Sequence, residues 1–182
     1  MTRIAVPTCS ETPAASKPML DAVSRQLGFT PNLFSIMSLS PNALTGWAGL
    51  QGALAKTLDS KTRDGIALVV SQVNSCLYCL SAYTYWAINV ARIRHEEILL
   101  NRLGSSSDSK RDAALTFAKK VVETRGKVTE TDLAIVREAG FTDANLIEII
   151  ALSAQCLLTN FINNVFDTPI DFPVVFLEPA SE

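Results

Sequence analysis

The apolar residues of this chain recur at the spacing of α-helices along almost its whole length. Over residues 109–124, for example, Ala113, Phe117 and Val121 recur every four residues with lysines between them, which gives a helix one apolar and one charged face. No segment sustains the alternation of polar and apolar residues that a half-buried strand shows. The pattern therefore predicts an all-α fold.

Capping residues, prolines and glycines divide the chain into successive helices, and no change of composition separates two domains. We expect a single domain over residues 1–182, with a loose N-terminal arm over 1–16, a mobile polar loop over 105–109 and a C-terminal tail over 173–182. The extended segment that follows Phe166 is expected to pack on the domain or on a neighbouring subunit. The expected helices span about 16–28, 31–37, 40–57, 60–73, 76–91, 94–103, 109–124, 129–140 and 142–166.

A faint internal repeat relates two of these helices. A shift of 83 residues overlays LDSKTRDGIALVVSQ on FTDANLIEIIALSAQ, with Ile66 matching Ile149 and Gln72 matching Gln155. Both segments place a capping residue before an apolar run, so they indicate two similar helical units.

The composition excludes several classes of protein. With 48% hydrophobic and 19% charged residues, the chain can bury a core and is not a disordered tail. Sixteen basic against eighteen acidic residues give a net charge of −2 without a basic stripe, which disfavours nucleic acid as a partner. Apolar runs such as 147–152 stop short of a membrane span, and the first 17 residues lack a signal peptide's apolar core. We expect a cytoplasmic protein with no membrane partner, and the surplus of apolar residues predicts a homo-oligomer.

The four cysteines are not equivalent. Cys9 lies in the polar leader, and Cys156 lies inside an apolar helix pattern where a buried thiol is expected. Cys76 and Cys79 form the one CxxC pair of a chain with a single histidine, so too few ligands exist for a zinc site. We expect no metal and no cofactor. The pair is either redox-active or two inert buried thiols.

The spacing of the pair suits disulfide chemistry, because residues i and i+3 lie on one face of a helix. Ser75 is predicted to cap the helix, with Cys76 at its first position and Cys79 in its first turn. The unpaired N–H groups at a helix start favour a thiolate, which makes Cys76 the more acidic thiol in this interpretation. A thiolate attacks peroxides or disulfides, and its neighbour then closes the internal disulfide.

Three neighbours bear on the reactivity of the pair. Tyr83 shares the helical face of both cysteines and is predicted to donate a hydrogen bond to a thiolate or a peroxide oxygen. Asp64 precedes Cys76 by twelve residues, about 18 Å along an unbroken helix, so it reaches the pair only if the chain folds back at residues 74–75. Otherwise Asp64 complements a helix dipole. His95 is expected to have a capping or surface role.

Aromatic residues are frequent around the pair. Packing is the ordinary role of such a cluster. The alternative is an apolar entrance suited to organic rather than inorganic peroxides, with walls made by Phe34, Trp47, Tyr83, Tyr85, Trp86 and Phe161.

Three separate segments, in order, resemble a known family: TPNLFSIMSLSPNAL, LDSKTRDGIALVVSQVNSCLYCLSAYT and FINNVFDTPIDF. Over residues 18–172 the chain resembles the alkylhydroperoxidase D-like, peroxidase-related branch of the carboxymuconolactone decarboxylase superfamily. The resemblance implies an all-helical bundle that assembles as trimers or hexamers, with its redox core over about 41–104. It also implies reduction of a hydroperoxide by the CxxC pair, which a dithiol protein such as a lipoyl-bearing one would reduce again.

The active site of that family has an acid, the CxxC pair, and a histidine four residues after the second cysteine. Carried onto this chain, the resemblance implies that Cys79 attacks and Cys76 resolves. Asp64 stands where the family has Glu, and Tyr83 stands where it has the histidine. The assignment of the attack to Cys79 differs from the helix-start argument. The missing histidine predicts slow turnover at pH 7 that rises in more basic solution.

The sequence thus predicts an oxidoreductase, a thiol peroxidase or disulfide reductase of antioxidant type. Two alternatives stay open: a lyase like the family's decarboxylases, and a non-enzymatic oligomer whose disulfide senses redox state.

Overall fold

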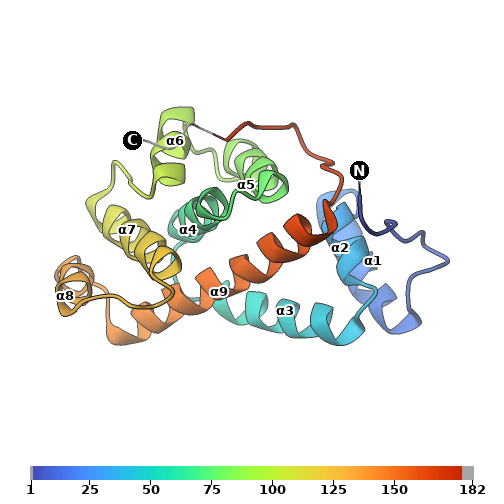
Figure 1. Cartoon of the computed structure of the whole chain (residues 1–182), viewed down its shortest axis with the longest axis horizontal. Coiled ribbons are helices and arrows are strands. Elements are labelled where there is room, and N and C mark those ends of the chain that lie inside the picture. The colour runs from blue at the N-terminus through green and yellow to red at the C-terminus, as the bar shows by residue number, and fades with distance from the viewer. Residues whose placement is uncertain (1, 178–182) are drawn as a thin grey trace.

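The computed structural model describes residues 2–177, and over these residues the chain forms helices and no strand, which confirms the all-α prediction. The long final helix ends at Phe166 as predicted, whereas the helix expected to reach residue 57 ends at Leu54. A 3₁₀ turn (Ala14–Ser16) precedes the α-helices (Figure 1), which are α1 (Lys17–Leu27), α2 (Asn32–Met37), α3 (Pro41–Leu54), α4 (Ser60–Val73), α5 (Leu77–Asn89), α6 (His95–Leu103), α7 (Ser109–Glu123), α8 (Glu130–Glu138) and α9 (Asp143–Phe166).

Side-chain caps account for most of the helix starts. The Asp59 carboxylate caps α4 by accepting a hydrogen bond from the Thr62 backbone N–H at 3.0 Å. Thr129 and Thr142 each form a capping box at the starts of α8 and α9. Gly28 and Gly104 end α1 and α6 in the left-handed conformation, which glycine adopts without strain.

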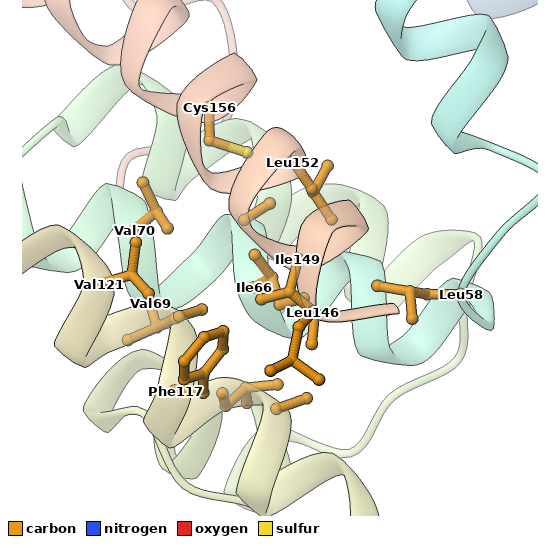
Figure 2. Close-up of a cluster of buried hydrophobic side chains, with 14 of the residues drawn as sticks. Leu58, Ile66, Val69, Val70, Phe117, Val121, Leu146, Ile149, Leu152 and Cys156 are labelled. Carbon is orange, nitrogen blue, oxygen red and sulfur yellow. The ribbon is translucent and has the colours of Figure 1, made fainter. Parts of the chain in front are cut away.

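Helix α4 lies at the centre of the molecule and packs against α5, α6, α7 and α9 (Figure 1). The main core forms where α4, α7 and α9 meet (Figure 2). Ile66 and Ile149, the pair matched by the internal repeat, are both completely buried in this core. The two repeated helices therefore pack against each other.

Helix α9 has the length and hydropathy of a membrane span, since its 24 residues include a window with a mean hydropathy of 1.5. The helix is longer than the uninterrupted apolar runs of the sequence. In the fold, however, α9 packs against α3, α4, α5 and α7, and several of its buried side chains are polar, among them Gln155 and Asn160. We interpret α9 as a helix of the protein core.

Both ends of the described chain are attached to the helices. In the N-terminal arm, the backbone N–H of Arg3 donates to the carbonyl of Phe166 at 2.8 Å, and Ser16 is buried, so the arm is not loose. After α9, the extended segment runs past α5 toward α6 (Figure 1), and its Val175 N–H donates to the Ser81 hydroxyl at 3.2 Å. This segment packs on the domain, as predicted up to residue 177. The rest of the predicted tail lies outside the described residues.

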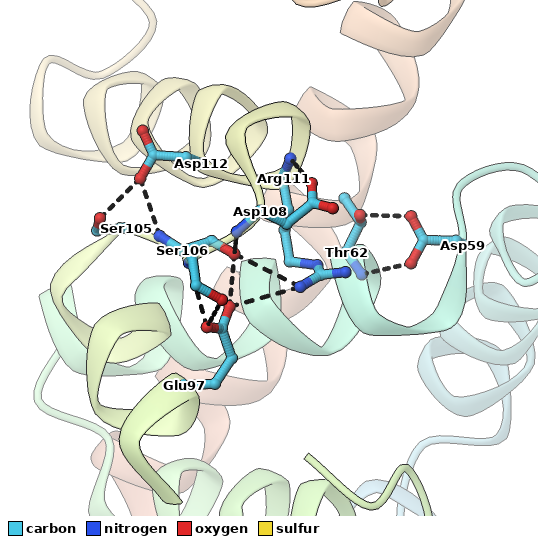
Figure 3. A network of polar contacts seen from close by, with 9 residues as sticks. Asp59, Thr62, Glu97, Ser105, Ser106, Asp108, Arg111 and Asp112 are labelled. Atoms are coloured by element: carbon cyan, nitrogen blue, oxygen red, sulfur yellow. Dashed lines mark hydrogen bonds and ion pairs between the residues drawn. The ribbon is translucent and has the colours of Figure 1, made fainter. Parts of the chain in front are cut away.

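Hydrogen bonds hold the loop over residues 105–109, which we expected to be mobile (Figure 3). The Asp112 carboxylate accepts from the Ser105 hydroxyl at 2.6 Å and from the Ser106 N–H at 2.8 Å. The buried Glu97 carboxylate accepts from the hydroxyls of Ser106 and Ser107. The serines that suggested mobility are therefore the donors that fix the loop between α6 and α7.

Candidate functional site

A sharp turn between α4 and α5 brings the two ends of the predicted site together. Ser75 adopts the left-handed conformation with φ 51°, and the Cys76 N–H donates to the carbonyl of Ser71 at 2.9 Å. The chain folds back at this point, so that α5 packs against α4. Because the chain folds back here, Asp64 can reach the site of Cys79.

Cys76 is itself the N-cap of α5, and the prediction that Ser75 caps this helix is wrong. The Cys76 sulfur accepts a hydrogen bond from the Cys79 backbone N–H at 3.3 Å. Because Ser75 takes the left-handed conformation in the turn, the helix begins one residue later than predicted, at Leu77. The two cysteine side chains lie within hydrogen-bonding distance of each other.

The environments of the two thiols reverse the expected order of acidity. A hydrogen bond from the Cys76 thiol lowers the pKa of Cys79, and with further hydrogen bonds from α9 it outweighs the opposing effect of burial. The same hydrogen bond to Cys79, together with burial, raises the pKa of Cys76. The argument that made Cys76 the more acidic thiol considered only the helix start, and left out both the hydrogen bond between the two thiols and the side chains of α9.

The side chains of α9 that surround Cys79 are polar and buried. The Asn163 amide donates to the Cys79 sulfur at 3.2 Å, and Asn160 and Thr159 also hydrogen-bond to it. These three residues were missed in the sequence. Their signal is a set of polar residues at helical spacing, 159, 160 and 163, on the same face as Cys156 in an otherwise apolar helix.

A cavity of about 730 Å³ opens onto Cys79. Asp64 of α4 and Cys79 and Tyr83 of α5 all line it, so the fold brings three of the four predicted site residues to one space. Cys79 is 3% exposed, whereas Cys76 is completely buried behind it. Burial raises the pKa of the Asp64 carboxyl.

Aromatic side chains form much of the cavity wall, as the sequence suggested. Trp47 presents an indole N–H that is buried and has no hydrogen-bond partner within residues 2–177. Phe161, which was expected in this wall, is instead 54% exposed. Tyr85 packs edge-on against Trp86. The aromatic residues that line the cavity are Phe34, Trp47, Tyr78, Tyr83, Trp86 and Phe172.

The phenol of Tyr83 lies between the cavity and α9. Its hydroxyl hydrogen-bonds with the thiol of Cys156, which is buried as predicted. Burial, followed by the neighbouring thiols Cys156 and Cys79, raises the pKa of Tyr83. Burial also raises the pKa of Cys156, to about 12. At neutral pH Tyr83 is therefore protonated, which suits a hydrogen-bond donor and not a base.

The remaining titratable residues of interest lie elsewhere. His95 is exposed at the first position of α6, in agreement with a surface or capping role. Within the part of the chain that the structure describes, no three His, Cys, Asp or Glu side chains are arranged to hold a metal ion.

Comparisons with known proteins show which sequences and folds this chain is similar to. Residues 41–123 match the carboxymuconolactone decarboxylase family, and the match begins where the predicted redox core begins. A search of curated protein sequences found no match.

Solved structures of the same fold cover nearly the whole chain. The alkylhydroperoxidase AhpD core of a peroxidase-related protein from Ralstonia eutropha JMP134 is 27% identical with a TM-score of 0.76, covering 93% of this chain and 92% of that one. A peroxidase-related protein from Silicibacter sp. TM1040 is 22% identical with a TM-score of 0.80, covering 92% and 91%. A cysteine-to-alanine variant of the debrominase Bmp8, in complex with 2,3,4-tribromopyrrole, is 21% identical with a TM-score of 0.77, covering 94% and 92%.

The family match includes the CxxC pair and Asp64, and the similar structures extend the likeness to the helices on either side. Over residues 41–123 the chain is therefore similar to the carboxymuconolactone decarboxylase family, and over nearly its whole length it has the fold of an alkylhydroperoxidase D-like, peroxidase-related protein.

Proposed function

We propose that this protein is a thiol-dependent reductase of organic hydroperoxides. The observation that carries the proposal is the position of the Cys79 sulfur, which lines an aromatic-walled cavity on one side and accepts hydrogen bonds from buried amides on the other. The partner thiol, Cys76, lies directly behind it.

In the first step, the Cys79 thiolate attacks the terminal oxygen of the hydroperoxide. The O–O bond breaks, Cys79 becomes a sulfenic acid, and the leaving alkoxide takes up a proton and departs as an alcohol. Cys79 suits this role because hydrogen bonds lower its pKa and because it, unlike Cys76, reaches the cavity.

In the second step, the Cys76 sulfur attacks the sulfenic acid. A disulfide forms, the S–O bond breaks, and the hydroxyl of the sulfenic acid leaves as water with the proton of the Cys76 thiol. An external dithiol, such as a lipoyl-bearing protein, then reduces the disulfide by thiol exchange and is itself oxidised.

Two further cavity residues have roles in this mechanism. Asp64 acts as a base, directly or through water, and its raised pKa brings it closer to the pH at which a general base works best. Tyr83 donates a hydrogen bond toward the reacting oxygen from the position that a histidine has in the family. Because its hydroxyl is shared with Cys156 and keeps its proton, we expect turnover at pH 7 to be slow.

A stopped-flow experiment with an aromatic hydroperoxide, cumene hydroperoxide, tests the proposal. The reduced protein should lose two thiols per peroxide consumed, faster as the pH rises. Cys79→Ser should abolish the reaction, whereas Cys9→Ser, which removes an exposed thiol, should leave it unchanged. Failure of the fully reduced protein to react at any pH between 6 and 9 would remove the proposal.

A second candidate is the reductive removal of a halogen from an aromatic ring. It is favoured by the aromatic lining of the cavity and by the debrominase with the same fold. Here the thiolate takes the halogen from carbon, the ring gains a proton in its place, and Cys76 then displaces halide to form the same disulfide. Release of bromide from tribromopyrrole by the reduced protein, without peroxide consumption, would select this reaction.

The other interpretations lead to different outcomes of the same assays. A decarboxylase-type lyase would keep its activity when Cys76→Ser and Cys79→Ser are combined. A redox sensor would change its subunit number between the oxidised and reduced forms without consuming peroxide, which light scattering detects. We propose a cytoplasmic homo-oligomer, a trimer or a hexamer, as its working form.

A further inference from the structure

Asn163 is a buried amide that hydrogen-bonds to the reactive sulfur. Its side chain is 3% exposed, and its N–H donates to the Cys79 sulfur at 3.2 Å. The carbonyl oxygen of the same amide is buried and has no hydrogen-bond partner within residues 2–177. The N–H of the amide therefore donates to the Cys79 sulfur, whereas its carbonyl oxygen has no partner among the described residues.

This arrangement is unfavourable for folding, because a buried carbonyl without a partner loses its hydrogen bonds to water. The carbonyl of Asn163 is not the only polar atom left unpaired here, since the Thr168 hydroxyl is also buried and unpaired. Both residues line a second cavity of about 510 Å³, which Cys79 does not line. Asn163 thus lies between the Cys79 sulfur and a second space that can hold water.

The Asn163 amide is one of several hydrogen-bond donors to the Cys79 sulfur, since the Cys76 thiol and the side chains of Asn160 and Thr159 also hydrogen-bond to it. The Thr159 hydroxyl donates to the carbonyl of Cys156 at 2.9 Å. Cys76, Tyr83 and Cys156 face Cys79 as neutral thiols or phenol, since the pKa of each is raised.

The charged residues of the cavity come from α4. Asp64 is an acid, which disfavours a nearby thiolate. Arg63 is the one cation among the described residues that line this cavity, and its guanidinium hydrogen-bonds to the carbonyl of Leu58.

We propose that Asn163 is a positioning residue that holds the Cys79 sulfur in its thiolate form through its amide N–H. A neutral amide has no proton to lose in the working pH range, unlike the histidine expected in this family. The acidity of Cys79 would then depend on the geometry of α9 and not on the charge state of a neighbouring base. The acidity of the Cys79 thiol can be measured without a substrate. Only the effect of Asn163 on turnover rests on the proposed function.

The test measures the pH dependence of Cys79 alkylation by iodoacetamide in the full chain carrying Cys9→Ser and Cys76→Ser. Serine at position 76 keeps a hydroxyl donor beside Cys79 and leaves one reactive thiol. Asn163→Asp keeps the shape of the side chain and removes the N–H donor. We expect the midpoint of alkylation to rise by at least about one pH unit, which lowers the thiolate fraction at pH 7 about tenfold.

Two further variants keep the result interpretable. Asn163→Ala removes the donor without adding charge and should shift the midpoint in the same direction. This variant carries the test if the Asp variant does not fold. Asn164→Asp adds the same charge on the next residue of α9, where the exposed amide donates to the carbonyl of Asn74 at 2.9 Å, and should leave the midpoint within about 0.3 units.

Unchanged midpoints in both Asn163 variants, with circular dichroism spectra like the parent, would overturn the proposal. So would an equal shift in Asn164→Asp. These outcomes are separate from failure of the proposed function: a shifted midpoint in a protein that reduces no peroxide would leave the role of Asn163 standing, whereas peroxide reduction with an unchanged midpoint would not.

Discussion

The close packing of α4 against α7 can be tested at Gly65, the residue after Asp64. A Cβ atom at this position would lie 3.0 Å from both terminal methyl carbons of Leu115, which is completely buried. Ala is favoured over Gly in a helix interior by about 0.8–1 kcal/mol. Forcing an extra methyl group into a packed core costs about 1–3 kcal/mol. Because the Leu115 side chain has no solvent to move into, we expect the steric cost to win and Gly65→Ala to lower the free energy of unfolding by about 1 kcal/mol.

Gly49→Ala is the matched control, since Gly49 lies inside α3 and a Cβ there would meet no atom within 4 Å. The helix preference then acts alone, and the variant should be more stable than the parent by about 0.8–1 kcal/mol. Urea unfolding followed by circular dichroism, repeated at two protein concentrations to detect subunit dissociation, measures both changes. If Gly65→Ala proves as stable as Gly49→Ala, the helices move apart at no cost and the reasoning is refuted.

Three further predictions concern the site and the surface. Cys76→Ser should consume one equivalent of hydroperoxide and stop with Cys79 as a sulfenic acid, whereas Cys79→Ser should consume none. Mass spectrometry and a peroxide assay measure both outcomes. Multiple turnovers by the Cys76→Ser variant would contradict the assigned roles. Burial raises the pKa of Asp64, so the native state binds the proton of this carboxyl more tightly than the unfolded state does. The free energy of unfolding therefore falls as the pH rises from about 3.8 through the raised pKa. Asp64→Asn should therefore gain stability over the parent at pH 7 but not at pH 3, and equal differences at both values in urea titrations would disprove it. Hydrogen bonds from Lys120 and Thr129 lower the pKa of Asp132 to about 2. The carboxylate of Asp132 therefore stabilises the fold above about pH 3.8, and this contribution is lost as the pH falls through about 2. Asp132→Asn should abolish this part of the acid dependence of stability, which thermal unfolding between pH 2 and 5 can detect.

Much of the fold could be predicted because its signals are local. The capping residue Thr142 and the apolar run after it predicted α9 to the residue at which it ends, and Gly104 marked the end of α6. Predictions that depended on a single backbone conformation were less accurate. The left-handed Ser75 moved the start of α5 by one residue, and that shift made Cys76 a cap.

The predicted mobility of residues 105–109 was wrong for a related reason. Serine and aspartate favour loops, but the same hydroxyls can also bond to distant carboxylates. The buried Glu97 lies nine residues before Ser106 in the sequence, and only the packing of α6 beside α7 makes it an acceptor for that hydroxyl. The N-terminal arm is another case, because its anchor, the carbonyl of Phe166, is more than 160 residues away.

The residues of this chain, without any structure, were enough to predict the helical fold and to single out the pair of sulfurs, because helix periodicity, caps and the CxxC spacing are properties of neighbouring residues. Tertiary structure added to the acidity of Cys79, which has hydrogen bonds from the side chains of α9 besides the one from Cys76. Asn163 is 84 residues from Cys79, and its amide reaches that sulfur only because α9 packs across the start of α5. A hydrogen bond acts over about 3 Å whatever the separation along the chain, so the acidity of a thiol follows from all its neighbours in space and not from its motif alone.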